Sequence, residues 1–311
     1  MNNFTILNKR QLKKMTQAER IEYQKQAKKY FGNLKNQLEN YEQKEKLHPI
    51  LLNGVRIFPF VIINKLNDIN WPIDNGPVIF SVNHSNSKDF PVISRLIKKH
   101  FFIIADYTMK NDFFVDMLNM ANGCIYVDRE SKESGQNAIQ QAIEGVNKGY
   151  NMAIFPETTW NLLNREPMLP RKWGDLKIAQ QTGRPIIPIA LAYTGCYCFA
   201  KFGKTRYVRK HYDLAEQDAD LYEEMSQLRT DIWNSPEYKQ KHKEVSYEEW
   251  LRQTIKSYKN FDVEYELSMI RKEDNYLKEQ FDYILEVGEE IHPVKEIEKR
   301  LQFAKINYRI K

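Results

Sequence analysis

Short runs of strand-forming residues alternate with stretches of helical pattern through the middle of this chain, and this alternation constrains the fold most. The strand-forming runs fall at 77–82, 101–105, 124–127, 152–155 and 185–192. Helical patterns lie near 89–99, 111–121, 135–148 and 174–182. Strands that alternate with helices of this length are typical of an α/β protein. We therefore predict a central mixed, largely parallel sheet with helices on both faces, flanked by N- and C-terminal helical segments.

The segments on either side of this core differ from it in composition, being more polar and helical in pattern. Residues 1–50 are polar, with eleven Lys or Arg against five Glu, and Thr16 followed by Glu19 predicts a capping box that starts a helix. Residues 205–311 are highly charged and helical in pattern, with an expected break between helices at 234–236. We predict a basic N-terminal helical segment (1–50), an α/β core (51–204) and a charged helical extension packed on that core (205–311).

The composition excludes several classes of protein. With 42% hydrophobic and 28% charged residues, the chain is of ordinary globular type. The longest apolar runs, such as 57–63, are far shorter than the roughly twenty residues of a membrane-spanning helix. The three cysteines have no metal-finger spacing, and the N-terminus lacks the apolar core of a secretory signal. We therefore expect a cytoplasmic protein without a bound metal.

A histidine and an aspartate follow the first of the predicted strands. His84 comes just after the run at 77–82, and Asp89 lies five residues later, where a helix is expected to begin. A carboxylate in that position can hold one imidazole nitrogen protonated and leave the other free to accept a proton. Such a base suits deprotonation of a hydroxyl group. Taken alone, the pair is better explained by an aspartate that caps a helix beside a loop histidine.

Four blocks in order give the chain a resemblance to the glycerolipid acyltransferase family. His84 and Asp89 form the first, and the others are residues 123–129 (GCIYVDR), 155–159 (FPETT, close to the family's Phe-Pro-Glu-Gly-Thr) and 184–190 (RPIIPIA). The segment 172–179 also resembles the family's basic-then-glycine entry to a helix. The resemblance covers about residues 75–195. It implies an enzyme that moves an acyl group from acyl-CoA or acyl carrier protein to glycerol 3-phosphate or a lysophospholipid.

The resemblance also implies roles for individual residues. His84 is expected to be the general base and Asp89 its partner. The expected acceptor site comprises Arg129, which would grip a phosphate through its planar fork, with Glu157, Thr158, Thr159, Trp160, Arg171 and Lys172. Without the resemblance, Arg129 is better explained as a surface residue paired with Asp128 or Glu130.

The third block departs from the family pattern, which continues Gly-Thr-Arg-Ser. Here Thr158 stands in place of the glycine and Trp160 in place of the arginine. The chain thereby loses backbone room for a phosphate and a bidentate phosphate ligand. Trp160 offers instead an apolar face suited to a sugar ring or a lipid chain. We therefore expect an acceptor other than plain glycerol 3-phosphate: a glycolipid, a polyol or a larger lysolipid.

The expected function is an O-acyltransferase with the acyl thioester as co-substrate and no bound cofactor. Its expected partners are the acyl donor, a lipid or glycolipid acceptor and the inner face of the membrane, reached peripherally through the basic segment 1–50 and the apolar run 57–63. Three alternatives stay open: lysophosphatidate acylation, a lipid-binding or assembly protein that has lost turnover, and, last, a nucleic-acid-binding protein, for which no motif is present.

Overall fold

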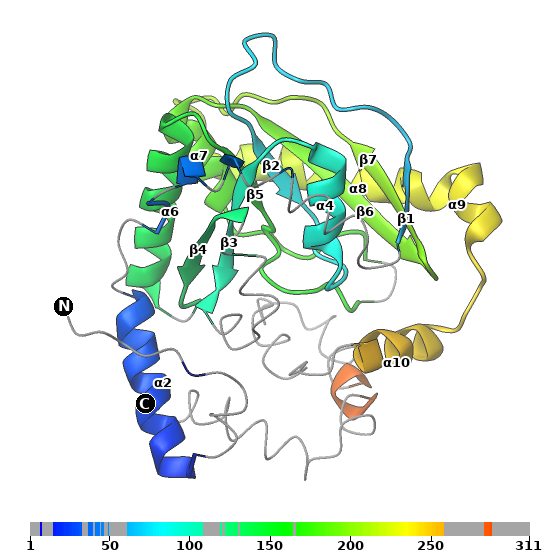
Figure 1. Cartoon of the computed structure of the whole chain (residues 1–311). Coiled ribbons are helices and arrows are strands. Elements are labelled where there is room, and N and C mark those ends of the chain that lie inside the picture. Colours follow the sequence, from blue (N-terminus) through cyan, green and yellow to red (C-terminus); the bar gives the residue numbers. More distant parts are fainter. Residues whose placement is uncertain are drawn as a thin grey trace.

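The computed structural model describes residues 7, 15–32, 37–39, 41–43, 45–46, 49, 61–107, 119, 122–129, 131–163, 166–257 and 283–287. A seven-stranded sheet lies at the centre of the described part, with strand order β1-β7-β6-β2-β5-β3-β4 (Figure 1). Its strands are β1 (Ile62–Lys65), β2 (Ile79–Val82), β3 (Phe101–Asp106), β4 (Cys124–Val127), β5 (Asn151–Ile154), β6 (Ile186–Thr194) and β7 (Tyr197–Phe202).

The sheet is mixed but largely parallel, as predicted. Strands β6, β2, β5, β3 and β4 run parallel to one another. β7 turns back from β6 as an antiparallel hairpin, and β1 pairs in parallel with β7 at the edge. The carboxyl ends of the five parallel strands therefore lie at one edge of the sheet, where ligands gather in α/β proteins.

Helices cover both faces of the sheet, which confirms the second part of the prediction. The helices with described bounds are α2 (Gln17–Gly32), α4 (Asp89–Ile97), α6 (Lys132–Asn147), α7 (Gly174–Thr182), α8 (Leu214–Asn234), α9 (Pro236–Lys241) and α10 (Tyr247–Ser257). α4 packs with Phe80 and Val82 on one face, whereas α6, α7 and α8 pack with Ile79 on the other. Alternate residues of β2 thus serve opposite layers, as the period of a strand requires.

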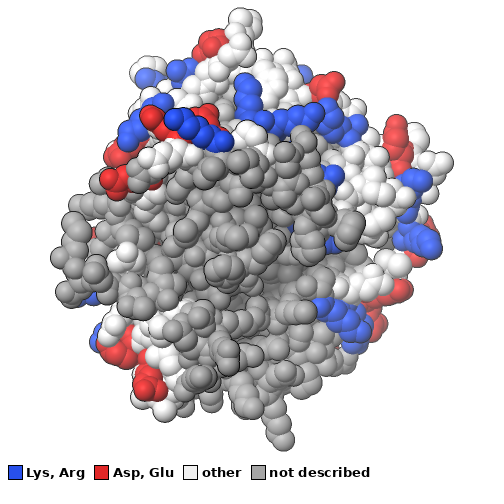
Figure 2. All heavy atoms as spheres, viewed as in Figure 1, with Lys and Arg blue, Asp and Glu red and all other residues white. Residues whose placement is uncertain are grey.

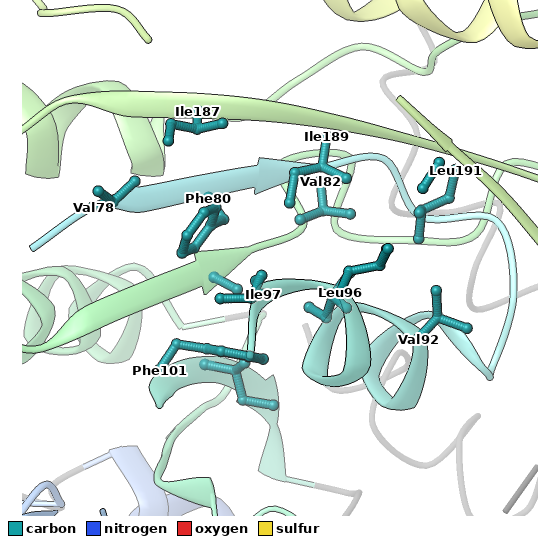
Figure 3. Close-up of a cluster of buried hydrophobic side chains, with 14 of the residues drawn as sticks. Val78, Phe80, Val82, Val92, Leu96, Ile97, Phe101, Ile187, Ile189 and Leu191 are labelled. Carbon is teal, nitrogen blue, oxygen red and sulfur yellow. The ribbon is translucent and has the colours of Figure 1, made fainter. Parts of the chain in front are cut away.

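The core beneath α4 fixes the start of that helix (Figure 3). Val92, Leu96 and Ile97 of α4 are buried against Phe80 and Val82 of β2 and their neighbours in β6. Burial of each such side chain stabilises the fold by about 1.5–3 kcal/mol. This packing holds the first turn of α4 close to the end of β2.

Outside the core, several sequence predictions can be compared with the structure. The capping box is confirmed, because the Thr16 amide donates to Glu19 and the Glu19 amide donates to the Thr16 hydroxyl. The break at 234–236 is also confirmed, since α8 ends at Asn234 and α9 begins at Pro236. Apart from Asn119, the helix expected near 111–121 lies outside the described residues.

Two strands and one surface role differ from the sequence analysis. Strands β1 and β7 were not predicted. The described end of the apolar run 57–63 enters β1, where Val61 and Ile63 pack in the core, although Ile62 is half exposed. That part of the run is therefore occupied by the fold and does not support the expected lipid contact. Within the described ranges, no helix combines the length and the apolar character needed to cross a bilayer.

Candidate active site

His84 and Asp89 meet at the carboxyl end of β2, where the chain turns into α4. His84 Nδ1 lies 2.8 Å from Asp89 Oδ2. The Asp89 side chain is completely buried, whereas that of His84 is 22% exposed. The imidazole Nε2 has no hydrogen-bond partner among the described residues. The histidine is thus held from behind by a buried carboxylate and open to a small degree at its other nitrogen.

Four donors converge on the Asp89 carboxylate. Besides His84, the backbone amides of Ser85 and Asn86 donate to Oδ2 at 2.7 and 2.9 Å, and the Tyr193 hydroxyl donates to Oδ1 at 2.7 Å. The two backbone amides can only donate, so the oxygen that they share with the imidazole acts as an acceptor toward the imidazole as well. Nδ1 of His84 therefore carries the proton, and Nε2 keeps a free lone pair.

Asn83 fixes the backbone on which His84 stands. Its side-chain oxygen accepts from the Leu191 amide at 2.6 Å, and its side-chain nitrogen donates to the Leu191 carbonyl at 3.1 Å and to the Ser85 hydroxyl at 2.7 Å. Asn83 is buried, so these bonds form away from water. The side chain thus ties the end of β2 to β6 just beyond the point where the regular ladder stops.

Glu157 ties the loop after β5 to the same place. Its Oε2 accepts from the His84 amide, and its Oε1 accepts from the Leu169 amide at 2.7 Å. Burial raises the pKa of Glu157 to about 7, opposed by the positive charge of Arg229 and by the two amides. Glu157 therefore braces the backbone of the predicted base. It donates or accepts no hydrogen bond at the imidazole itself.

Arg129 follows β4 and joins the turn that Glu157 begins. Its Nε donates to Asp106 at 2.7 Å, and a terminal nitrogen donates to the Thr158 carbonyl at 2.6 Å. The guanidinium is mostly buried, with 14% of the side chain exposed. Asp106, at the end of β3, offsets its charge. The structure thus brings Arg129 to the loop of the third block, and phosphate binding by Arg129 stays a prediction.

The loop residues after Glu157 differ in their access to the site. Thr158 has a φ of +60°, and its hydroxyl finds no partner among the described residues, whereas Thr159 is fully buried. The Trp160 ring meets the His84 ring edge-to-face at 5.7 Å between centroids, and the Phe155 ring stacks on the His84 ring at 4.4 Å between centroids. Two aromatic rings therefore shape the surroundings of the imidazole. Thr159 does not offer its side chain to a substrate.

Arg171 does not belong to an open site, contrary to the prediction. Its side chain is completely buried and forms ion pairs with Asp175 at 2.6 Å and Asp218 at 3.1 Å. These pairs connect the start of α7 to α8, so the guanidinium is committed to the interior. Lys172 is exposed, and its amide donates to the Pro156 carbonyl at 2.9 Å. Arg165, which could have supplied charge, lies outside the described residues.

Three residues that the sequence did not single out complete the surroundings of the pair: Asn83, Tyr193 and Arg229. Arg229 of α8 is buried, donates to the Pro167 carbonyl at 3.0 Å and stacks over Trp233. Burial lowers the pKa of Arg229, and the charges of Glu157 and Asp89 oppose that shift. Asn83 adjoins His84 in the sequence and was within reach of prediction. Tyr193 and Arg229 are distant in the sequence and carried no signal.

The described residues contain no group of three or more His, Cys, Asp or Glu side chains placed to hold a metal ion. Cys198 is buried in β7, whereas Cys196 is exposed in the turn before it. The chemistry that the described geometry can perform is acceptance of a proton at Nε2 of His84.

Comparison with known proteins gives a family match over the part of the chain that contains this site. Residues 40–192 match the family model described as Acyltransferase. The 1-acyl-sn-glycerol-3-phosphate acyltransferase of Saccharomyces cerevisiae is 26% identical over 128 residues, which are 41% of this chain and 42% of that protein. The enzyme of that name from Borreliella burgdorferi is 31% identical over 117 residues, 38% of this chain and 46% of that protein. The chain thus spans less than half the length of these curated relatives.

A solved structure shares the fold. The 1-acyl-sn-glycerophosphate (LPA) acyltransferase PlsC from Thermotoga maritima superposes with a TM-score of 0.52 at 16% sequence identity, over 70% of this chain and 91% of that chain. The family match falls on the part of the chain that holds the strands β2 to β5, the His84–Asp89 pair and Glu157. The match to the Acyltransferase family model thus covers residues 40–192, just under half of the chain, and that part is similar to PlsC-like acyltransferases.

Proposed function

We propose that the protein is an O-acyltransferase in which His84 acts as the general base. An acceptor hydroxyl would donate its proton to Nε2 of His84 while its oxygen attacks the carbonyl carbon of an acyl thioester. The ester forms, the carbon–sulfur bond breaks, and the thiol of CoA or of the acyl carrier leaves with the proton. A single observation carries this proposal: an accessible imidazole whose Nδ1 is bound to a buried, fully hydrogen-bonded carboxylate.

Asp89 contributes by holding the imidazole in the tautomer that can accept a proton. It also stabilises the imidazolium that forms during attack, as the aspartate does in a serine-protease triad. General-base catalysis of this kind typically contributes about 10²–10⁴ in rate. The names of the curated relatives support acyl transfer to an acylated glycerol phosphate as the reaction class.

We further propose that the acceptor is not plain glycerol 3-phosphate but a lysophospholipid-like lipid, a glycolipid or a polyol. Arg129 is paired with Asp106, and Arg171 is enclosed by two carboxylates. Thr158 stands where the family pattern has glycine, and it occupies the left-handed backbone conformation that glycine adopts at little cost. Trp160 adds an aromatic edge beside His84. These features favour an acceptor that offers an apolar or sugar surface to the base.

Mass-spectrometric detection of acyl transfer tests the reaction. The purified protein would receive a mixture of acyl-CoA and acyl carrier protein thioesters together with a cell lipid and metabolite extract. His84→Ala is expected to lose the acylated product, whereas His211→Ala, which changes an exposed histidine, is expected to keep it. No product from folded wild-type protein with either donor would favour the lipid-binding or assembly protein.

Rates on matched acceptors test the second proposal. Glycerol 3-phosphate, a lysophospholipid, a glycolipid and a free polyol would be compared at equal concentrations of one donor. We expect the phosphate monoester to be the poorer substrate. A strong preference for glycerol 3-phosphate would rule the proposal out.

We also propose peripheral attachment to an anionic membrane through the basic segment 1–50, of which α2 is the longest described helix. Co-sedimentation with anionic lipid vesicles is expected at low salt and lost at high salt. Absence of binding at low salt would contradict the attachment.

A further inference from the structure

Tyr193 lies against the one oxygen of Asp89 that His84 does not use. The imidazole and two backbone amides donate to Oδ2, and among the described residues the Tyr193 hydroxyl is the donor to Oδ1, at 2.7 Å. The two residues are 104 positions apart in the sequence. Each carboxylate oxygen of Asp89 therefore has its own donors. The donors to Oδ2 come from the segment between β2 and α4, and the donor to Oδ1 comes from β6.

The backbone of Tyr193 is held by the sheet. Tyr193 lies near the end of β6, and the antiparallel register places it opposite Cys198 of β7. Its hydroxyl is buried, and burial together with the negative charge of Asp89 raises the pKa of Tyr193 well above its ordinary value. The hydroxyl therefore stays protonated throughout the neutral range and remains a permanent donor to Oδ1.

A carboxylate at the start of a helix needs such a donor. The torsion that turns the two oxygens of an aspartate is broad, so local geometry alone does not select one orientation. The amides of Ser85 and Asn86 hold Oδ2 from the backbone side. A donor on Oδ1 fixes the second oxygen and with it the plane of the group.

We propose that Tyr193 is a positioning residue for the His84–Asp89 pair. Its hydroxyl orients the carboxylate so that Oδ2 faces Nδ1 of His84, and it thereby keeps the imidazole in the tautomer whose Nε2 can accept a proton. This inference deepens the proposed function and rests on it. Tyr193 touches neither the substrate nor the reacting atoms.

Several charged or titratable groups surround this arrangement. Glu157, in the loop after β5, interacts electrostatically with His84. Arg229 on α8 and Cys198 on β7 interact with Asp89, and Arg95 on α4 interacts with Cys198. Tyr193→Phe leaves all four in place and removes one oxygen atom. A change in pH dependence in that variant therefore reports on the hydroxyl.

Kinetics of Tyr193→Phe test the role. We expect kcat to fall about tenfold or more through misorientation of the base, while KM changes less than about twofold because the substrate does not contact Tyr193. The acid limb of the kcat/KM profile should move to higher pH by about half a unit, because a carboxylate that loses a donor stabilises the imidazolium more strongly. A fall in kcat without the pH shift would mean a purely structural role and would overturn the proposal.

Tyr238→Phe is the matched control. Tyr238 is also buried, and its hydroxyl donates to the backbone carbonyl of Tyr193 at 3.5 Å without touching the carboxylate. It should keep wild-type kcat and the wild-type pH profile. In an Asp89→Asn background, Tyr193→Phe should cause no further loss, because its partner is already altered. Wild-type kinetics for Tyr193→Phe, or losses that multiply in the double variant, would contradict the mechanism.

A measurement that needs no turnover separates this inference from the proposed function. In protein with ¹⁵N-labelled histidine, a proton resonance on Nδ1 of His84 can be assigned by its absence in His84→Ala. We expect it to be observable in the wild type and in Tyr238→Phe, and to be broadened by exchange in Tyr193→Phe. An unchanged resonance in folded Tyr193→Phe would overturn the positioning role. A missing acyl product with a changed resonance would overturn only the proposed reaction.

Discussion

Thr158 stands in a backbone conformation that favours glycine, so glycine at this position should give a more stable protein than alanine does. Its φ is +60°, in the left-handed region, and Thr is β-branched. The turn is held there from both sides, because the Thr158 amide donates to the Phe155 carbonyl and its own carbonyl accepts from Arg129. The chain cannot relax the conformation without breaking these bonds, so the strain persists in the native state.

The expected magnitude follows from two opposing terms. A left-handed conformation costs an L-residue with a side chain roughly 1–2 kcal/mol. Glycine avoids that cost but loses about 0.5–1 kcal/mol more backbone entropy on folding than alanine does. Thr158→Gly should therefore be more stable than Thr158→Ala by about 0.5–1 kcal/mol. Comparison with alanine cancels the loss of the methyl and hydroxyl groups.

Thr159 provides the matched control. It is fully buried next in the chain but does not have a positive φ. There Thr159→Gly should be less stable than Thr159→Ala by about 0.5–1 kcal/mol. The glycine-minus-alanine difference is thus expected to change sign between two adjacent threonines.

Urea unfolding of the four variants, followed by circular dichroism, measures these differences. In thermal unfolding, which serves as a second measurement, free-energy differences of this size move the midpoint by about 2 °C in a domain of ordinary size. If Thr158→Ala proves as stable as Thr158→Gly, or more stable, backbone strain at position 158 is refuted.

Three further predictions concern stability. Between pH 4.5 and about 7, native Glu157 retains a proton that the unfolded chain has released, so the free energy of unfolding falls with rising pH, by on the order of 3 kcal/mol. Glu157→Gln should reduce this pH dependence, measured by urea unfolding at pH 5 and pH 8. An equal pH dependence in the variant would contradict the buried proton. Arg171→Met should destabilise the fold by about 3–5 kcal/mol, because the carboxylates of Asp175 and Asp218 lose their buried partner. A loss of stability under 1 kcal/mol in thermal unfolding would contradict this. Within α6, Gly145→Ala should destabilise the protein by about 1–2 kcal/mol, because its new Cβ would lie 2.6 Å from the Leu38 side chain. Gly135→Ala meets no atom within 4 Å and should stabilise the protein by about 0.5–1 kcal/mol. Equal effects of the two variants on the calorimetric midpoint would refute the packing argument.

The elements of the core were predictable because their signals are local. The run at 124–127 and the helix at 174–182 match the observed elements residue for residue, and the other parallel strands agree to within two residues at their ends. Each strand is a short apolar run between turn residues, which a sequence pattern can register. The α/β class followed from their alternation.

The antiparallel edge of the sheet could not be predicted in the same way. β1 is short and half exposed, and it pairs with β7, so that Ile62 meets Tyr197 far along the chain. The strand depends on that distant partner more than on its own residues. The last predicted strand-forming run ends at 192, and no second strand was expected after it, so the hairpin of β6 and β7 was not predicted.

The residues of the candidate site also differ in how far the sequence could predict them, because some contacts are local and others join distant parts of the chain. His84 and Asp89 are five residues apart, so their contact follows from one local turn. Tyr193 comes from the far end of β6, and Arg229 from α8. A single sequence contains no sign of such encounters. Arg171 shows the converse, since a basic residue near a predicted site turned out to be a buried partner of two acids.

Glu157 joins two pieces of backbone that are far apart in the sequence, the amide of His84 and the amide of Leu169. This one side chain thereby couples the position of His84 to that of the loop that follows β5. Local opening of the loop should release both amides together, with a common rate of hydrogen exchange. An acceptor that presses on this loop would therefore move the base with it, so that binding and alignment of the imidazole become one event.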